Sequence, residues 1–138
     1  MSRGDRATLT DTDTRQLGAF ARLGPALRAS LAGVSHAARD EAAFRSEVVM
    51  TVLLTPLAAA LPVSAFQRLF LVLTMLFVIV VELLNSAIES TVDRISMDRH
   101  PLSGQAKDLG SAAVAVAIFM STVSWLVIAG PVVVRWFW

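Results

Sequence analysis

Three long stretches of this chain share one property, which is that they contain no charged side chain. They lie between Glu47 and Arg68, between Arg68 and Glu82, and between Asp108 and Arg135. A helix that crosses a bilayer needs about 20 mainly apolar residues, and Pro62 ends the first of these helices near Leu61. The pattern therefore predicts transmembrane helices over residues 40–61, 66–95 and 103–134.

In the segment before the first span, apolar residues recur at intervals of three and four. These residues are Leu17, Phe20, Leu23, Leu27, Leu31 and Val34. With arginines beside them, they predict an amphipathic helix over residues 15–36 that lies on the inner leaflet. Gly24 and Pro25 are expected to interrupt it, with Pro25 as the first position of the helix proper. Residues 1–14 are polar and are expected to form a flexible tail.

Composition agrees with a small membrane protein of a single domain, residues 1–138. Hydrophobic residues make up 55% of the chain and charged residues 17%, and the mean hydropathy is +0.63, outside ordinary soluble usage. The absence of Cys excludes disulfides and thiolate metal sites. No block of Lys and Arg suggests a nucleic-acid partner, and the polar start does not resemble a cleavable signal peptide.

Basic residues predict the orientation of the three spans. Seven Arg precede the charge-free stretch of the first span, and Arg94, Arg99 and Lys107 lie between the charge-free stretches of the second and third spans. Only Arg68 separates the first two charge-free stretches, and only Arg135 follows the last one. By the positive-inside rule, the N-terminus and the second loop are cytoplasmic. Ser103, at the end of that loop, is expected to cap the third span.

Polar residues line the cytoplasmic end of the second span, in the stretch VELLNSAIESTVDR (81–94). Glu82, Asn85 and Glu89 are three and four residues apart, so they share one helical stripe, which Asp93 continues. Glu82 falls about two turns inside the apolar layer, where a charge costs several kcal/mol. Carboxylates in this position need cations, which could be metal ions, Arg or Lys, or protons in transit. A polar seam that only holds helices together is the alternative, and we prefer it for the hydroxyl side chains Ser86, Ser90 and Thr91.

Few residues elsewhere in the chain can join this stripe. Glu41 reaches the depth of Glu89 from the first span, while Lys107, Asp108 and Ser111 begin the third. Such an oxygen-rich set suits Mg²⁺, and a lysine suits a phosphate group. The chain contains no GxxxxGK[ST] motif, so phosphate binding would not use a Walker loop.

Four motifs carry a specific resemblance, namely EAAFRSE (41–47), VELLNSAIE (81–89), VDRI (92–95) and SGQAKDLGSAA (103–113). They resemble the bacterial integral-membrane diacylglycerol kinases, which share a family with the undecaprenol kinases, and the resemblance extends from about Arg22 to the third span. It implies an all-α membrane protein with three transmembrane helices, an N-terminal surface helix and a homotrimeric assembly. It also implies phosphorylation of the primary hydroxyl of diacylglycerol to phosphatidic acid, with Mg²⁺ and ATP, at the cytoplasmic face of the inner membrane. Three thin helices cannot enclose both a nucleotide and a lipid, so we expect composite inter-subunit sites.

The resemblance also implies roles for individual residues. Glu82 corresponds to the catalytic base, Glu41 and Glu89 to the magnesium ligands, and Asn85 and Asp93 to supporting residues beside them. The nucleotide-binding positions are Arg22, Ala29, Glu41, Glu89, Asp98, Arg99, His100, Lys107 and Asp108. The lipid-substrate positions are Arg22, Phe44, Arg45, Glu47, Glu82 and Ser111.

The chain departs from the family pattern in having no Tyr. Better-known members have tyrosines where Ala29 and Arg99 stand here, so the contacts to the adenine base differ, whereas the expected phosphate and metal residues are present.

Two alternatives remain at this point. Undecaprenol kinase would keep every catalytic residue and differ in the lipid groove. A non-enzymatic bundle would conduct protons or cations through Glu82 and Glu89. The group formed by Glu41, Lys107 and Asp108 favours an enzyme, because a metal–nucleotide site requires it and a proton path does not.

Overall fold

The structure is a computed structural model that describes the backbone of residues 5–95 and 100–137 and the side chains of residues 23–95 and 100–136. All regular secondary structure in these ranges is helical. The helices are α1 (Asp5–Asp40), α2 (Ala42–Ala60), α3 (Ala65–Ile95) and α4 (Pro101–Phe137). This confirms the all-α fold class.

Helix α1 differs from its prediction. It begins at Asp5, so residues 5–14 are helical where we expected a flexible tail, and it continues through Pro25 without the expected interruption. The Ala, Leu and Arg residues around Pro25 are strong helix formers, which offsets the loss of one backbone hydrogen bond. Residues up to His36 form one compact unit and residues from Ala37 onward form another. The predicted position of α1 on a membrane surface stays a prediction.

Helices α2, α3 and α4 are long and apolar enough to cross a membrane, over Ala42–Ala60, Ala65–Ile95 and Pro101–Trp136. These ranges agree with the three predicted spans to within a few residues. The chain is therefore a multi-pass membrane protein.

Side chains fix the beginnings of α3 and α4. The backbone N–H of Ser64 donates to Gln67 Oε1 (2.9 Å) and that of Gln67 to Ser64 Oγ (3.2 Å), a reciprocal capping box. At α4 the backbone N–H of Leu102 donates to His100 Nδ1 (3.3 Å). The cap is therefore His100, and the predicted cap Ser103 lies inside the helix. Pro101 explains the shift, since proline is preferred in the first helical position.

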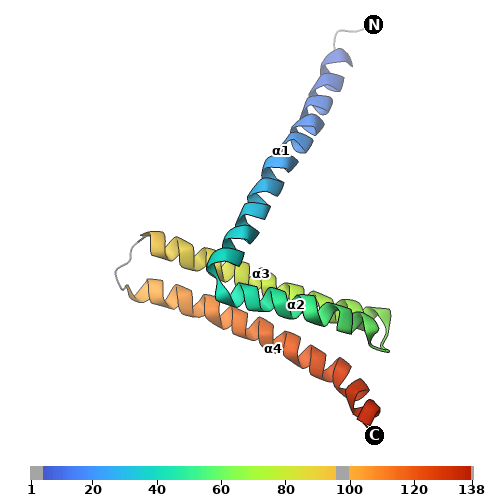
Figure 1. The fold of residues 1–138 in the computed structure, drawn as a ribbon. Coiled ribbons are helices and arrows are strands. Elements are labelled where there is room, and N and C mark those ends of the chain that lie inside the picture. Colours follow the sequence, from blue (N-terminus) through green and yellow to red (C-terminus); the bar gives the residue numbers. More distant parts are fainter. Residues whose placement is uncertain (1–4, 96–99, 138) are drawn as a thin grey trace. The chain divides into compact units, whose positions relative to one another are not determined.

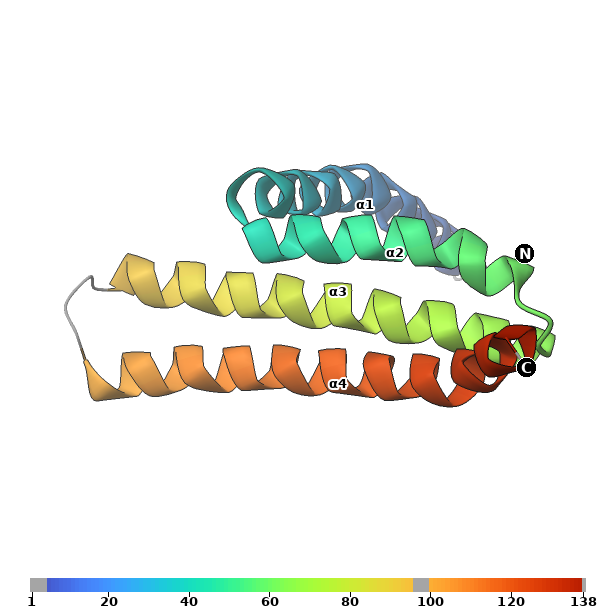
Figure 2. The same cartoon turned by 60° about the horizontal axis from the view of Figure 1, so that its bottom comes forward.

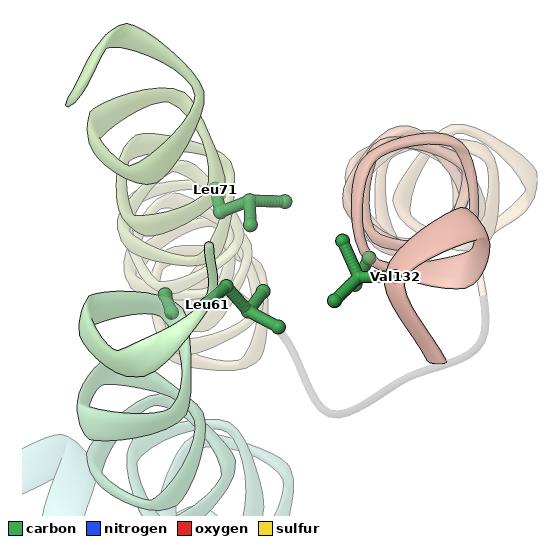
Figure 3. Packing of buried hydrophobic residues seen from close by; sticks show 5 residues of the cluster. Leu61, Leu71 and Val132 are labelled. Atoms are coloured by element: carbon green, nitrogen blue, oxygen red, sulfur yellow. The ribbon is translucent and has the colours of Figure 1, made fainter. Parts of the chain in front are cut away.

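Helix α3 lies between α2 and α4 and is antiparallel to both (Figures 1 and 2). The apolar core joins the end of α2, the start of α3 and the end of α4. Its buried members are Ala58, Leu61, Leu71, Ala129 and Val132. Figure 3 shows Leu71 and Val132 pointing toward each other across the gap between α3 and α4. This core holds the three helices together at one end of the bundle, and the polar stripe of α3 lies at the other.

A single copy leaves most of the apolar surface of these helices uncovered. Large side chains such as Leu53, Phe77, Leu84, Phe119 and Val127 are exposed. In a membrane protein these faces meet lipid or other copies of the chain.

Candidate active site

The buried carboxylate of Glu82 is the central feature of the candidate site. Only 4% of Glu82 is exposed, although it lies on a span whose other buried residues are Leu71, Met75 and Val78. One turn further along α3, Asn85 Nδ2 donates to Glu89 Oε1 at 3.1 Å. The stripe predicted from the sequence is therefore present, with the Asn85 amide hydrogen-bonded to Glu89.

Carboxylates from α2, α3 and the turn before α2 lie near Glu82. Glu41 and Glu89 both lie close enough to repel its charge, and Glu82 in turn repels Glu47 on α2. Oε2 of Glu47 is buried and has no hydrogen-bond partner among the described residues. Several acids so close together in an apolar setting need cations to offset their repulsion.

Lys107 brings positive charge to the inner end of this cluster. Its Nζ lies 2.5 Å from Asp93 Oδ1 and forms an ion pair that joins α4 to α3. Glu89 also attracts Lys107 electrostatically. The lysine predicted to meet a phosphate group therefore lies beside the acidic stripe.

Glu41 reaches the cluster from the turn between α1 and α2. It precedes α2 with extended backbone angles (φ −103°, ψ 114°), so it is not on the first helical turn as predicted. Arg45 supports this turn, because its Nη1 donates to the carbonyl oxygens of Arg39 (2.9 Å) and Ala38 (3.4 Å) in the last turn of α1. Carbonyls at a helix end lack helical partners. Arg45 thus satisfies two of them and holds Glu41 in place.

The protein side chains of the site can supply only some of the ligands that a magnesium ion needs. Within residues 23–95 and 100–136, no group of three or more His, Cys, Asp or Glu side chains is arranged to hold a metal ion. Mg²⁺ usually takes only one or two carboxylates and completes its shell with water and substrate phosphates. Glu41 and Glu89, which both act electrostatically on the buried Glu82, supply the one or two carboxylates that such a site needs.

The other predicted site residues are distributed as follows. Phe44 lies in the first turn of α2 and is buried. Asp108 and Ser111 are exposed on the first turns of α4. His100 caps α4. Ala29 is exposed on α1, in the unit that ends at His36. The side chain of Arg22, and both Asp98 and Arg99, lie outside the described residues.

An apolar groove of about 780 Å³ adds residues that the sequence analysis missed. It runs along α2, α3 and α4, with Glu47 among its lining residues, and Ser121 and Trp125 line its wall on α4. The Nε1 of Trp125 is buried and finds no hydrogen-bond partner in the described part of the chain. Ser121 and Trp125 are four residues apart in a span without charges, a spacing that could have revealed a shared face.

Comparison with known proteins gives this geometry a context. The family model for prokaryotic diacylglycerol kinase matches residues 28–129. A diacylglycerol kinase of Pseudomonas aeruginosa is 54% identical over 99 residues, which cover 72% of this chain and 80% of the relative. The diacylglycerol kinase of Escherichia coli K12 is 44% identical over 109 residues, with 79% and 89% covered. That of Helicobacter pylori 26695 is 37% identical over 106 residues, with 77% and 83% covered.

The chain belongs to the prokaryotic diacylglycerol kinase family. It is therefore an enzyme, a lipid kinase, and family membership favours this over the non-enzymatic bundle. The matched region contains Glu41, Glu82, Glu89, Lys107 and the groove up to Ala129. Residues 1–27, with Arg22 among them, precede it.

Arg45 generates a testable prediction about the turn at Glu41. Replacing Arg45 with Ala removes two charge-assisted hydrogen bonds, each worth about 1.5–3 kcal/mol. We expect the amides of residues 40–45 to exchange with deuterium at least about tenfold faster, measured by mass spectrometry of the purified kinase. Arg39→Ala is the matched control, since it keeps the carbonyl that accepts the bond. Equal exchange in both variants would show that Arg45 does not support the turn.

Proposed function

We propose that this protein transfers the γ-phosphoryl group of ATP to the primary hydroxyl of diacylglycerol, which yields phosphatidic acid. The observation that carries the proposal is the buried Glu82, flanked by Glu41 and Glu89 and followed along α3 by the Lys107–Asp93 ion pair. Membership of a family whose relatives are named diacylglycerol kinase supports this substrate.

Glu82 is the proposed general base. Its carboxylate takes the proton of the lipid hydroxyl as the hydroxyl oxygen forms a bond to the γ-phosphorus, and the bond to the bridging oxygen breaks to release ADP. A general base supplies about 10²–10⁴-fold, so the positioning of the phosphates supplies most of the remaining acceleration.

Phosphate positioning falls to the residues around Glu82. Glu41 and Glu89 would hold Mg²⁺, which when bound neutralises charge on the ATP phosphates. Lys107 provides a donor for the same phosphates, and Asp93 keeps its ammonium group beside the stripe at 2.5 Å. Further nucleotide contacts from Arg22, Ala29, Asp98, Arg99, His100 and Asp108 are part of the proposal, on the resemblance alone.

The groove along α2, α3 and α4 is the proposed position of the lipid. Its wall is almost wholly apolar, which suits acyl chains, and Glu47 places one carboxylate in the lining. Because Glu47 lies within electrostatic range of Glu82, a lipid with its chains in the groove has its head group near the base. Phe44, Arg45 and Ser111 complete the proposed lipid-side residues.

The assembly we propose is a homotrimer with sites shared between subunits. Three thin helices cannot enclose a nucleotide and a lipid together, and most apolar side chains of the spans remain uncovered in one copy. The proposed location is the bacterial inner membrane, with the N-terminus and the active site cytoplasmic. The distribution of Arg and Lys supports this orientation.

Substrate preference tests the proposed function directly. Purified protein in mixed micelles is given labelled ATP, Mg²⁺, and diacylglycerol and undecaprenol in equal amounts. We expect label mainly in phosphatidic acid, and none when Mg²⁺ is chelated. Label mainly in undecaprenyl phosphate would instead make the chain an undecaprenol kinase, which keeps the same catalytic residues.

The role of Glu82 is tested by a change that keeps its shape. Glu82→Gln removes the proton acceptor and leaves the proposed nucleotide residues untouched. We expect turnover to fall by about 10²-fold or more while equilibrium binding of Mg-ATP stays nearly unchanged. Asn85→Ala is expected to be milder, because an amide can orient a group but cannot deprotonate it. Near-normal turnover of Glu82→Gln would leave Glu82 as a residue of a structural polar seam.

Shared sites are tested by mixing inactive variants. Glu82→Gln and Lys107→Ala damage different parts of one site, so hybrid trimers contain some intact sites if subunits contribute different residues. We expect activity to return on mixing and subunit exchange. Mixing two differently tagged preparations of Glu82→Gln is the control and should recover nothing. Formed hybrids without activity at any ratio would place each site within one subunit.

A further inference from the structure

Gly110 on α4 packs directly against the side chain of Asn85 on α3. A Cβ atom at Gly110 would overlap Asn85 Oδ1 and would lie 3.4 Å from its Cγ. The two other glycines of α4, Gly104 and Gly130, have nothing within 4 Å of the same position. The close approach is therefore particular to Gly110, where the absence of a side chain makes room for an amide.

This contact orients the Asn85 amide. Oδ1 is buried against α4 and has no hydrogen-bond partner within the described residues, whereas Nδ2 donates to Glu89 Oε1 at 3.1 Å. Reversing the amide would lose this bond and place two oxygens against each other. Asn85 thus gives up a hydrogen bond at one end of its amide and holds Glu89 with the other.

We propose that Gly110 is a positioning residue for the magnesium ligand Glu89, and that it acts through Asn85. The space at Gly110 lets the amide lie against α4, and from there Nδ2 fixes the rotation of the Glu89 carboxylate. The inference rests on the proposed function, in which Glu89 holds Mg²⁺. It adds a residue to which neither the sequence motifs nor the charge pattern gave a role.

A side chain at Gly110 has a defined consequence. The added methyl group must push the Asn85 amide away, because its Cβ would overlap Asn85 Oδ1. Glu89 then loses its donor and can rotate freely. Hydrogen bonds from neighbouring groups orient metal ligands, and losing one typically costs about 10–100-fold in metal affinity.

The experiment measures metal binding directly, with Mn²⁺ as the probe in the presence of β,γ-imido-ATP, by the electron paramagnetic resonance signal of free Mn²⁺. We expect Gly110→Ala to weaken Mn²⁺ binding by about tenfold or more. The matched control Gly104→Ala, on the same helix, should stay within about twofold of the unsubstituted protein. Unchanged binding in Gly110→Ala would overturn the proposal.

A double variant separates positioning from simple packing damage. If Gly110 acts through Asn85, then adding Gly110→Ala to Asn85→Ala should weaken Mn²⁺ binding no further. We also expect Gly110→Ala to lower the midpoint of thermal unfolding, and the smaller side chain of Asn85→Ala to restore that midpoint in the double variant. Two losses that add would instead show that Gly110 acts independently of Asn85.

A third variant keeps the test valid if Gly110→Ala does not fold. Asn85→Leu retains the bulk of the side chain against α4 but removes the donor to Glu89, so it should weaken Mn²⁺ binding by a similar factor. Binding as in the unsubstituted protein would overturn the proposal. Failure of the unsubstituted protein itself to bind Mn²⁺ with the nucleotide would overturn the proposed function as well.

Discussion

The main constraint on this structure is that a carboxylate in an apolar layer needs positive charge close by. Glu82 is buried on a membrane span, and the charges of Glu41 and Glu89 oppose its own. Such an arrangement is costly without positive charge close by. Among the described residues, Lys107 supplies positive charge at the inner end of the stripe, where it pairs with Asp93. We infer that the remaining compensation arrives with the substrate, as a metal ion bound to a nucleotide.

The same constraint divides α3 into two halves with different tasks. Toward its N-terminal end, Leu71 packs with Leu61 and Val132 and holds the three spans together through apolar contact. Toward its C-terminal end, polar contacts replace these. The Lys107–Asp93 ion pair and the Asn85–Glu89 hydrogen bond lie there. The apolar half can therefore stabilise the bundle while the other half keeps acids that would destabilise it.

Two helix ends near the site are stabilised by hydrogen bonds that involve the side chains of Arg45 and His100, neither of which is part of the acidic stripe. Arg45 satisfies carbonyls at the end of α1 and thereby supports the extended turn at Glu41. His100 caps α4, the helix that carries Lys107. Precise positioning of catalytic groups depends on such support. Arg45 and His100, for which the family resemblance implies substrate contacts, therefore also support helix ends.

The sequence by itself determined the three spans, the polar stripe and the family, because these follow from local patterns. The charge-free stretches predicted the three spans. The spacing of three and four residues placed Glu82, Asn85 and Glu89 on one face of a helix, and four short motifs indicated the kinase family. Only the tertiary structure decided which side chains meet. It paired Lys107 with Asp93, joined Asn85 to Glu89, placed Gly110 against that amide, and lined the groove with Ser121 and Trp125. The physical reason is that contacts between helices depend on their rotation and spacing, which the packing of all three spans sets together.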